Sequence, residues 1–186
     1  MPAIYTKAPQ NVITIVEHAL SQWHQELKDA DVKIGVLFKF SSSEELPALK
    51  ANGHPVNGII SIVSTKDRLS KGFDSEITLD GAIWATSKEE QKYALIDHLL
   101  SRIELKPVKP KKGNKATHGS DEEKEDAEEL TYAVDCNQRP CLRFRSGDWN
   151  VGYGFEDVVR RHGEHSPEYI NLSAAQNIVD SIIEDQ

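Results

Sequence analysis

The sequence predicts an α+β fold in which a small mixed or antiparallel sheet carries a central helix packed on it. Three segments indicate strands. Residues 32–40 and 58–64 are rich in β-branched and aromatic side chains, and residues 73–79 partly alternate apolar and polar ones. Residues 9–28 and 87–105 repeat apolar side chains at helical spacing. We expect these five segments to form the core within residues 1–105.

The first helix, predicted for residues 9–28, has a single apolar stripe. Its members recur every three or four residues and are Val12, Val16, Ala19, Leu20, Trp23 and Leu27. His18 and His24 lie off this stripe, so we expect both side chains to face the solvent.

The second helix is apolar on most of its surface, which is typical of a central helix covered on both sides. Its apolar members are Tyr93, Ala94, Leu95, Ile96, Leu99, Leu100 and Ile103. Ser87 and Glu90 match the capping-box pattern S-x-x-E, which predicts the start of the helix. Pro107 cannot continue a helix, so we expect the end near Leu105.

Residues 106–129 differ abruptly from the rest in composition, because they contain six Lys and seven Asp or Glu with almost no apolar side chains. Such a segment cannot bury enough apolar area to offset the entropy of ordering. We therefore predict a charged, flexible insertion, which is either a solvated linker or a partner-binding arm. Residues 130–186 are expected to complete the same domain.

The C-terminal part is predicted to hold a β-hairpin followed by helices. Residues 130–134 and 141–145 indicate two short strands around a turn at residues 137–140. A short helix is expected over residues 155–162. Ser173 is the expected cap of a last helix, whose buried face would be Ile178, Val179, Ile182 and Ile183.

The overall composition limits the classes of function. The chain of 186 residues has a formal net charge of −8, which disfavours non-specific binding to nucleic acid. It has no apolar run long enough for a membrane span and no secretory signal pattern, so we expect a cytoplasmic protein. Cys136 and Cys141 are then expected to stay reduced, as ordinary cysteines.

Arginines concentrate in the C-terminal third, at positions 139, 143, 145, 160 and 161. Trp149, Tyr153 and Phe155 lie among them, and a basic face with aromatic side chains can bind single-stranded nucleic acid. Aromatic residues at such spacing are more often part of a core. Nucleic acid is therefore not the expected partner.

The central helix also carries the strongest chemical signal. A zinc peptidase places two histidines four residues apart on a helix, with a glutamate directly after the first as general base. His98 stands at the first position, but Leu99 replaces the glutamate and Arg102 replaces the second histidine. Asp97 is interpreted as a charged residue on the exposed side of the helix, about 100° from His98.

The residues LKDADVKIGVLFKF and FDSEITLDGAIWATSKEEQKYALIDHLL make residues 12–105 similar to the phage metallopeptidase family. The phrase GFEDVVRRHGEHS resembles the ending of that family. The resemblance implies a minimal zincin-like fold and a phage or prophage origin. Only His98 carries over, as the first metal ligand. Zinc is possible through His98 together with His162 and His165.

The expected function is therefore that of a phage-encoded accessory protein on a non-catalytic metallopeptidase-like scaffold. It would bind a host or phage protein, and countering a host defence protein is one version. A first alternative is an active zinc-dependent hydrolase that uses His98, His162 and His165, with Glu164 as base. A second alternative is an acidic inhibitor that imitates DNA. No cofactor is required by the preferred reading, and the sequence predicts no oligomeric state.

Overall fold

The computed structural model describes residues 3–42, 47–108, 132–145 and 156–184, and no side chains from 178 onward. Most of the predicted insertion, at residues 109–129, lies outside the described residues, as do Trp149, Tyr153 and Phe155. The side chains of the expected buried face of the last helix also lie outside them. The described helices and strands confirm the α+β class.

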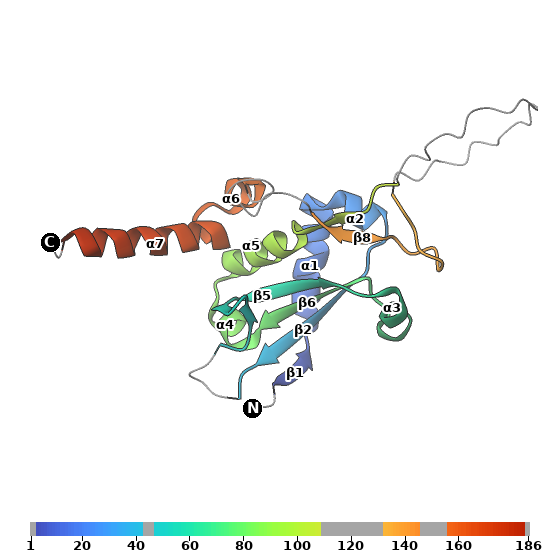
Figure 1. The fold of residues 1–186 in the computed structure, drawn as a ribbon, viewed down its shortest axis with the longest axis horizontal. Helices are drawn as coiled ribbons and strands as arrows, with labels where there is room; N and C mark the ends of the chain where they lie inside the picture. Colours follow the sequence, from blue (N-terminus) through green and yellow to red (C-terminus); the bar gives the residue numbers. More distant parts are fainter. Residues whose placement is uncertain (1–2, 43–46, 109–131, 146–155, 185–186) are drawn as a thin grey trace, which may run out of the picture.

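A mixed sheet of four strands, in the order β1-β2-β6-β5, forms the centre of the fold (Figure 1). β2 (Ile34–Phe40) and β6 (Ser75–Asp80) run parallel, whereas β1 (Ile4–Lys7) pairs antiparallel with β2, and β5 (Gly58–Ile62) antiparallel with β6. The three predicted strands are thus confirmed as β2, β5 and β6. β1 was not predicted, because its four residues, all of them exposed, form too short a segment to show the alternating pattern of a half-buried strand.

The core lies between one face of this sheet and the helices α1 (Gln10–Trp23) and α5 (Glu89–Leu100). Alternate residues of the strands point to this face, as the strand period requires. The fully or nearly fully buried side chains at this interface include Val12, Val16, Phe38, Ile60, Ile77, Leu79, Ile96, Leu99 and Leu100. The predicted packing of a central helix on a sheet is confirmed by α5.

The first predicted helix is divided in two, which corrects the continuous helix expected over residues 9–28. α1 ends at Trp23, and the short α2 (Gln25–Asp29) follows. Between them His24 leaves the helical conformation, with φ −130° and ψ 51°. The expectation that His24 faces the solvent is wrong, because it is 3% exposed. His18 is exposed as expected.

The ends of the central helix also differ from the prediction. α5 is preceded by α4 (Gly81–Thr86), and the Ser87 hydroxyl donates to the carbonyl of Ile83 in α4 (2.7 Å). The capping contact of α5 lies one residue further on, where the side-chain oxygen of Gln91 accepts from the Lys88 amide (3.0 Å). α5 ends at Leu100, and the chain then enters β7 (Ile103–Leu105).

The C-terminal part packs on the core through new strand and helix contacts. β8 (Leu142–Phe144) pairs antiparallel with β7, whereas the expected hairpin is described as a turn closed by the bridge between Val134 and Pro140 and by a hydrogen bond from the Cys141 amide to the Ala133 carbonyl (2.8 Å). α6 (Glu156–His162) agrees with the prediction for residues 155–162. β7 supplies apolar side chains opposite those of β8, which explains why β8 pairs there.

The last helix, α7 (Pro167–Glu184), begins earlier than predicted and runs away from the sheet (Figure 1). Ser166, rather than Ser173, caps it, because its hydroxyl accepts from the Tyr169 amide (3.2 Å). Pro167 suits the first turn of a helix, where its missing N–H has no partner to lose. A 3-10 turn, η1 (Gly163–His165), joins α6 to α7.

The remaining elements lie at the two ends of the sheet. β3 (Lys50–Ala51) and β4 (His54–Pro55) form a small hairpin before β5, and α3 (Thr65–Lys71) follows β5. On both sides of residues 109–131 the chain is held together by a bridge between Pro107 and Tyr132 and by a hydrogen bond from the Ala133 amide to the Lys106 carbonyl (2.7 Å). None of the described helices is long and apolar enough to cross a membrane.

Candidate functional site

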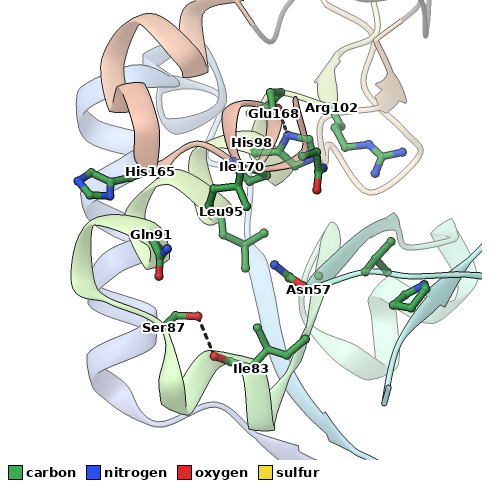
Figure 2. Close-up of a pocket in the computed structure, with 15 residues that line it drawn as sticks. Asn57, Ile83, Ser87, Gln91, Leu95, His98, Arg102, His165, Glu168 and Ile170 are labelled. Atoms are coloured by element: carbon green, nitrogen blue, oxygen red, sulfur yellow. Dashed lines mark hydrogen bonds and ion pairs between the residues drawn. The ribbon is translucent and has the colours of Figure 1, made fainter. Parts of the chain in front are cut away.

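A pocket of about 350 Å³ lies where the edge of the sheet meets α5 and the first turn of α7 (Figure 2). Residues 55–58 of β4 and β5 form one wall, and α4 contributes Ile83 at the base. The opposite wall is formed by η1 and α7. The lining combines apolar and polar side chains, which is typical of binding sites for peptides and small molecules.

One stripe of α5 faces this pocket. Gln91, Leu95 and His98 of α5 line it at spacings of four and three residues, and Arg102, in the turn that follows α5, lines it four residues after His98. Residues three or four apart lie on one side of a helix, so the spacing itself places these side chains together. Figure 2 shows them along one side of the pocket, with Asn57 across from Leu95.

His98 is held by a carboxylate from the C-terminal part. Its Nδ1 lies within hydrogen-bond distance of Oε1 of Glu168, in the first turn of α7 (Figure 2). The two side chains are 20% and 22% exposed. Since a carboxylate accepts, the Nδ1–H group is the donor. Oε2 of Glu168 is buried and has no hydrogen-bond partner among the described residues. Sequence reasoning missed Glu168, because nothing local marks its contact with His98.

Leu99 and Arg102 occupy different environments. Leu99 is completely buried, and its Cδ1 lies 2.8 Å from the position a Cβ would take on Gly58, so glycine permits this close approach of α5 to β5. Arg102 is half-buried and lines the pocket, and burial lowers the pKa of its guanidinium. The pocket therefore contains a cation at the position of a second motif histidine.

Asp97 forms a second polar cluster on another side of α5. It is fully buried, which corrects the interpretation of an exposed residue. Its Oδ1 accepts from Nε2 of His24 (2.8 Å) and from Arg161 (2.9 Å), and its Oδ2 accepts from Nε2 of His162 (3.0 Å). Burial acts to raise the pKa of Asp97, but the hydrogen bonds from His24 and Arg161 hold it below the ordinary value.

Adjacent residues of α5 thus bind two successive elements of the C-terminal part. Asp97 holds α6 through Arg161 and His162, and His98 holds α7 through Glu168. Neighbouring residues on a helix point about 100° apart. The two contacts therefore hold α6 and α7 from different directions. Together they position the wall of the pocket that η1 and α7 form.

Comparison with known protein families shows which family the chain belongs to. The profile of the family described as "Putative phage metallopeptidase" matches residues 4–182, nearly the whole length. The chain belongs to this family. The match extends the resemblance from residues 12–105 to the C-terminal part. No curated protein and no solved structure matches the chain.

A phage metallopeptidase with the full zinc motif would hold its metal on α5, and the residues found there do not fit that role. His98 is bonded to Glu168, Leu99 is apolar and buried, and Arg102 offers a guanidinium in place of a ligand nitrogen. A guanidinium stays protonated and has only donors, so it does not ligate a cation.

Of the three histidines predicted as metal ligands, the structure brings two to the pocket. His98 and His165 line the pocket, whereas His162 donates to Asp97. Within the described ranges, no group of three or more His, Cys, Asp or Glu side chains is arranged to hold a metal ion. Glu164, the expected base of the hydrolase alternative, lies 3.9 Å from His165 and its side chain is 75% exposed.

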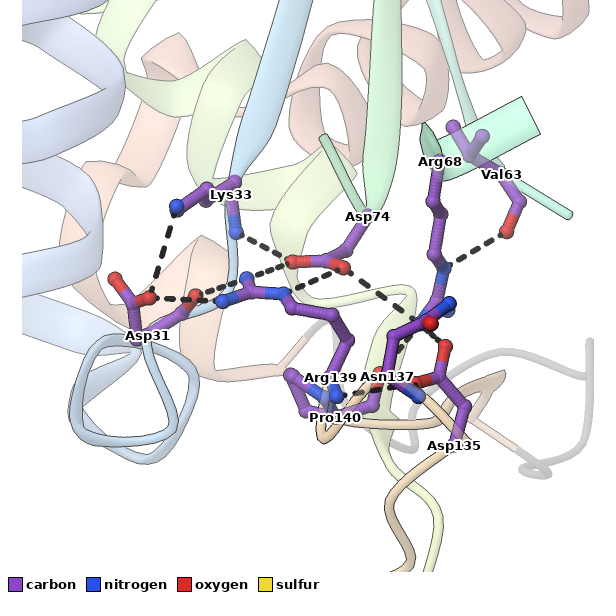
Figure 3. A network of polar contacts seen from close by, with 9 residues as sticks. All are labelled: Asp31, Lys33, Val63, Arg68, Asp74, Asp135, Asn137, Arg139 and Pro140. Carbon is purple, nitrogen blue, oxygen red and sulfur yellow. Dashed lines mark hydrogen bonds and ion pairs between the residues drawn. The ribbon is translucent and has the colours of Figure 1, made fainter. Parts of the chain in front are cut away.

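The arginines of the C-terminal third bind carboxylates within the chain. Arg143 and Arg145 lie beside Glu104, and Arg160 pairs with Asp157. Arg139 binds Asp31 and Asp74 at the end of the sheet. Arg68 also approaches Asp74, and it pairs with Asp135 (Figure 3). This network attaches the turn at residues 135–140 to β6 and α3.

The lowered pKa of Asp97 predicts a specific loss of stability in acid. Its folded pKa lies below the unfolded value of about 3.9, so its stabilising contribution is complete above that value and is lost as the pH falls through the folded pKa. Between about pH 5 and pH 2 we expect the wild type to lose more free energy of unfolding than Asp97→Asn, which cannot ionise. Urea unfolding over this range measures both, and equal losses would contradict the prediction.

Proposed function

We propose that this protein is a non-catalytic member of the phage metallopeptidase family that binds a segment of a host or phage protein in the pocket between β5, α5 and α7. The proposal depends on which residues occupy the positions of the zinc motif. The pocket persists with a polar and apolar lining, while Leu99 and Arg102 remove the general base and the second ligand that zinc hydrolysis requires.

The edge of the sheet favours an extended polypeptide as the ligand. β5 is the last strand in the sheet order, and its first residue, Gly58, lines the pocket. A strand with one unpaired side can hydrogen-bond to an extended segment, and adjoining pockets then select side chains. Membership of a phage family favours a partner encoded by the phage or by its host, including a host defence protein.

Two exposed asparagines on α7 provide a matched test. Asn171 lines the pocket, whereas Asn177 is an exposed residue of the same helix outside it. Peptides selected from a random display library on the wild-type protein should bind Asn171→Trp at least about tenfold more weakly, because the indole fills the pocket, a loss of roughly 1.4 kcal/mol. Asn177→Trp should bind them like the wild type. Equal binding to all three proteins would reject the pocket as the site.

The contact between His98 and Glu168 favours one second candidate, a hydrolase in which His98 acts as base. A histidine oriented by a carboxylate inside a pocket is a common general-base arrangement. Mass spectrometry of the selected peptides after incubation with the protein separates the two functions. We expect intact peptides with and without a chelator. Cleavage that disappears in His98→Ala would replace the binding function with the hydrolase.

A further inference from the structure

The charged side chains of the pocket are not equivalent in their access to a ligand. Glu168 uses Oε1 to bind His98, and its Oε2 is buried from solvent. Arg102 lines the pocket from the turn that follows α5 (Figure 2). A ligand in the pocket therefore meets the guanidinium of Arg102 in the lining, whereas one oxygen of Glu168 is already bound to His98.

The backbone of Arg102 is held by neighbouring backbone groups. Its carbonyl accepts a hydrogen bond from the Arg145 amide (2.9 Å), directly before β7 begins. Its side chain is half-buried, and burial lowers the pKa of the guanidinium, which indicates that it has lost part of its hydration. A partly desolvated cation is stabilised by an anion at hydrogen-bond distance.

We propose that Arg102 makes the pocket a site for a carboxylate group of the bound segment. This inference rests on the proposed function and names the chemistry of its ligand. A guanidinium has five donors in a planar fork that matches the two oxygens of a carboxylate, so Arg102 binds one in addition to its contacts within the chain. The guanidinium thus takes over the attraction for a ligand oxygen that a metal supplies in a zinc peptidase.

The rest of the pocket favours a carboxylate on a peptide over a larger anion. Apolar side chains of Val56, Ile83, Leu95 and Ile170 form much of the lining and suit the aliphatic parts of a peptide. The net charge of −8 repels polyanions such as nucleic acids over longer distances. The carboxylate belongs either to the C-terminus of the segment or to an aspartate or glutamate within it.

Three blocked tripeptides test the proposal and separate these sources. They are acetyl-leucyl-glycyl-leucine as the free acid, the same peptide with an amidated C-terminus, and an amidated peptide with glutamate in the middle. Each is titrated to millimolar concentration into the isotope-labelled full chain, and binding is read from the nuclear magnetic resonance signals of the pocket. At least one carboxylate peptide should bind about tenfold more tightly than the amidated glycyl peptide. Whichever carboxylate peptide gains identifies the source.

Variants of two arginines complete the experiment. Arg102→Gln should abolish the preference for the carboxylate, while Arg160→Gln should keep it, because Arg160 is exposed and pairs with Asp157 away from the pocket. Thermal unfolding checks that both variants fold, and Arg102→Lys should retain part of the preference if Arg102→Gln does not fold. Equal binding of acid and amide, a preference that survives the loss of Arg102, or no pocket response to any peptide overturns the proposal. The proposed function is judged separately, by the selected peptides and the two asparagine variants.

Discussion

Asp97→Ala should lower the free energy of unfolding by about 3 to 5 kcal/mol, the cost expected when one partner of a buried ionic cluster is removed. Asp97 is fully buried, and its two oxygens accept from His24, Arg161 and His162. Without the carboxylate, these donors lose their acceptor in a site with little access to water. Urea unfolding near neutral pH measures the change.

Asp157→Ala is the matched control, because its carboxylate also pairs with an arginine of α6 but its side chain is 53% exposed. An exposed pair of this kind contributes about 0.5 kcal/mol or less. Hydrogen exchange adds a local measurement. The amides of α6 and η1 should exchange faster in Asp97→Ala than in the control, since Asp97 accepts hydrogen bonds from Arg161 and His162 of α6. A loss of stability equal to that of the control would show that the cluster does not hold α6 in place.

The second large effect is expected directly before the N-terminal end of β6. Asp74→Ala should destabilise the fold by about 3 to 5 kcal/mol, because Asp74 is 1% exposed and accepts from the Lys33 amide (2.9 Å) and from Arg139. Arg68 approaches the same carboxylate (3.6 Å) and is itself nearly buried. Removal of the Asp74 carboxylate would leave the guanidinium groups of Arg68 and Arg139 with fewer acceptors beside the N-terminal end of β6.

Asp31 offers the control, because it binds the same Arg139 guanidinium from the surface and is 74% exposed on its side chain. Asp31→Asn should cost no more than about 1 kcal/mol, because asparagine suits the left-handed backbone at this position (φ 52°) and only the charge is removed. Denaturant unfolding of both variants and the wild type shows whether the loss of stability depends on the burial of the carboxylate or only on the presence of an ion pair. Similar losses in both would mean that the interior position of Asp74 has no special importance.

The core of this fold could be predicted from the sequence because it depends on periodic apolar residues. β2, β5 and β6 and the central helix α5 all bury side chains at the spacing that their conformation requires. β1 could not be predicted, since its stability comes from backbone pairing with β2 and its side chains remain exposed. Helix boundaries were displaced where Ser87 and Ser166 made capping contacts that differ from the sequence pattern.

The candidate site was predicted only in part, for a different physical reason. His98 was identified by its motif position, but its partner Glu168 lies 70 residues away and has no local signal. The buried pair of His24 and Asp97 spans 73 residues. A polar side chain in an amphipathic pattern is interpreted as exposed, because burial without a partner costs free energy. Only the tertiary structure shows that partners are present.

The bridge between Pro107 and Tyr132 has a practical consequence for engineering. The Pro107–Tyr132 bridge and the hydrogen bond from the Ala133 amide to the Lys106 carbonyl already hold residues 106–107 next to residues 132–133. A segment of another length inserted between them should therefore add little strain to the core. Loop-closure entropy grows only slowly with length, by about 0.6 kcal/mol for each doubling. A fluorescent reporter or an affinity tag spliced between positions 108 and 132 would be attached at the other end of the fold from α7 (Figure 1), so we expect it to leave the pocket accessible while the protein is followed in cells.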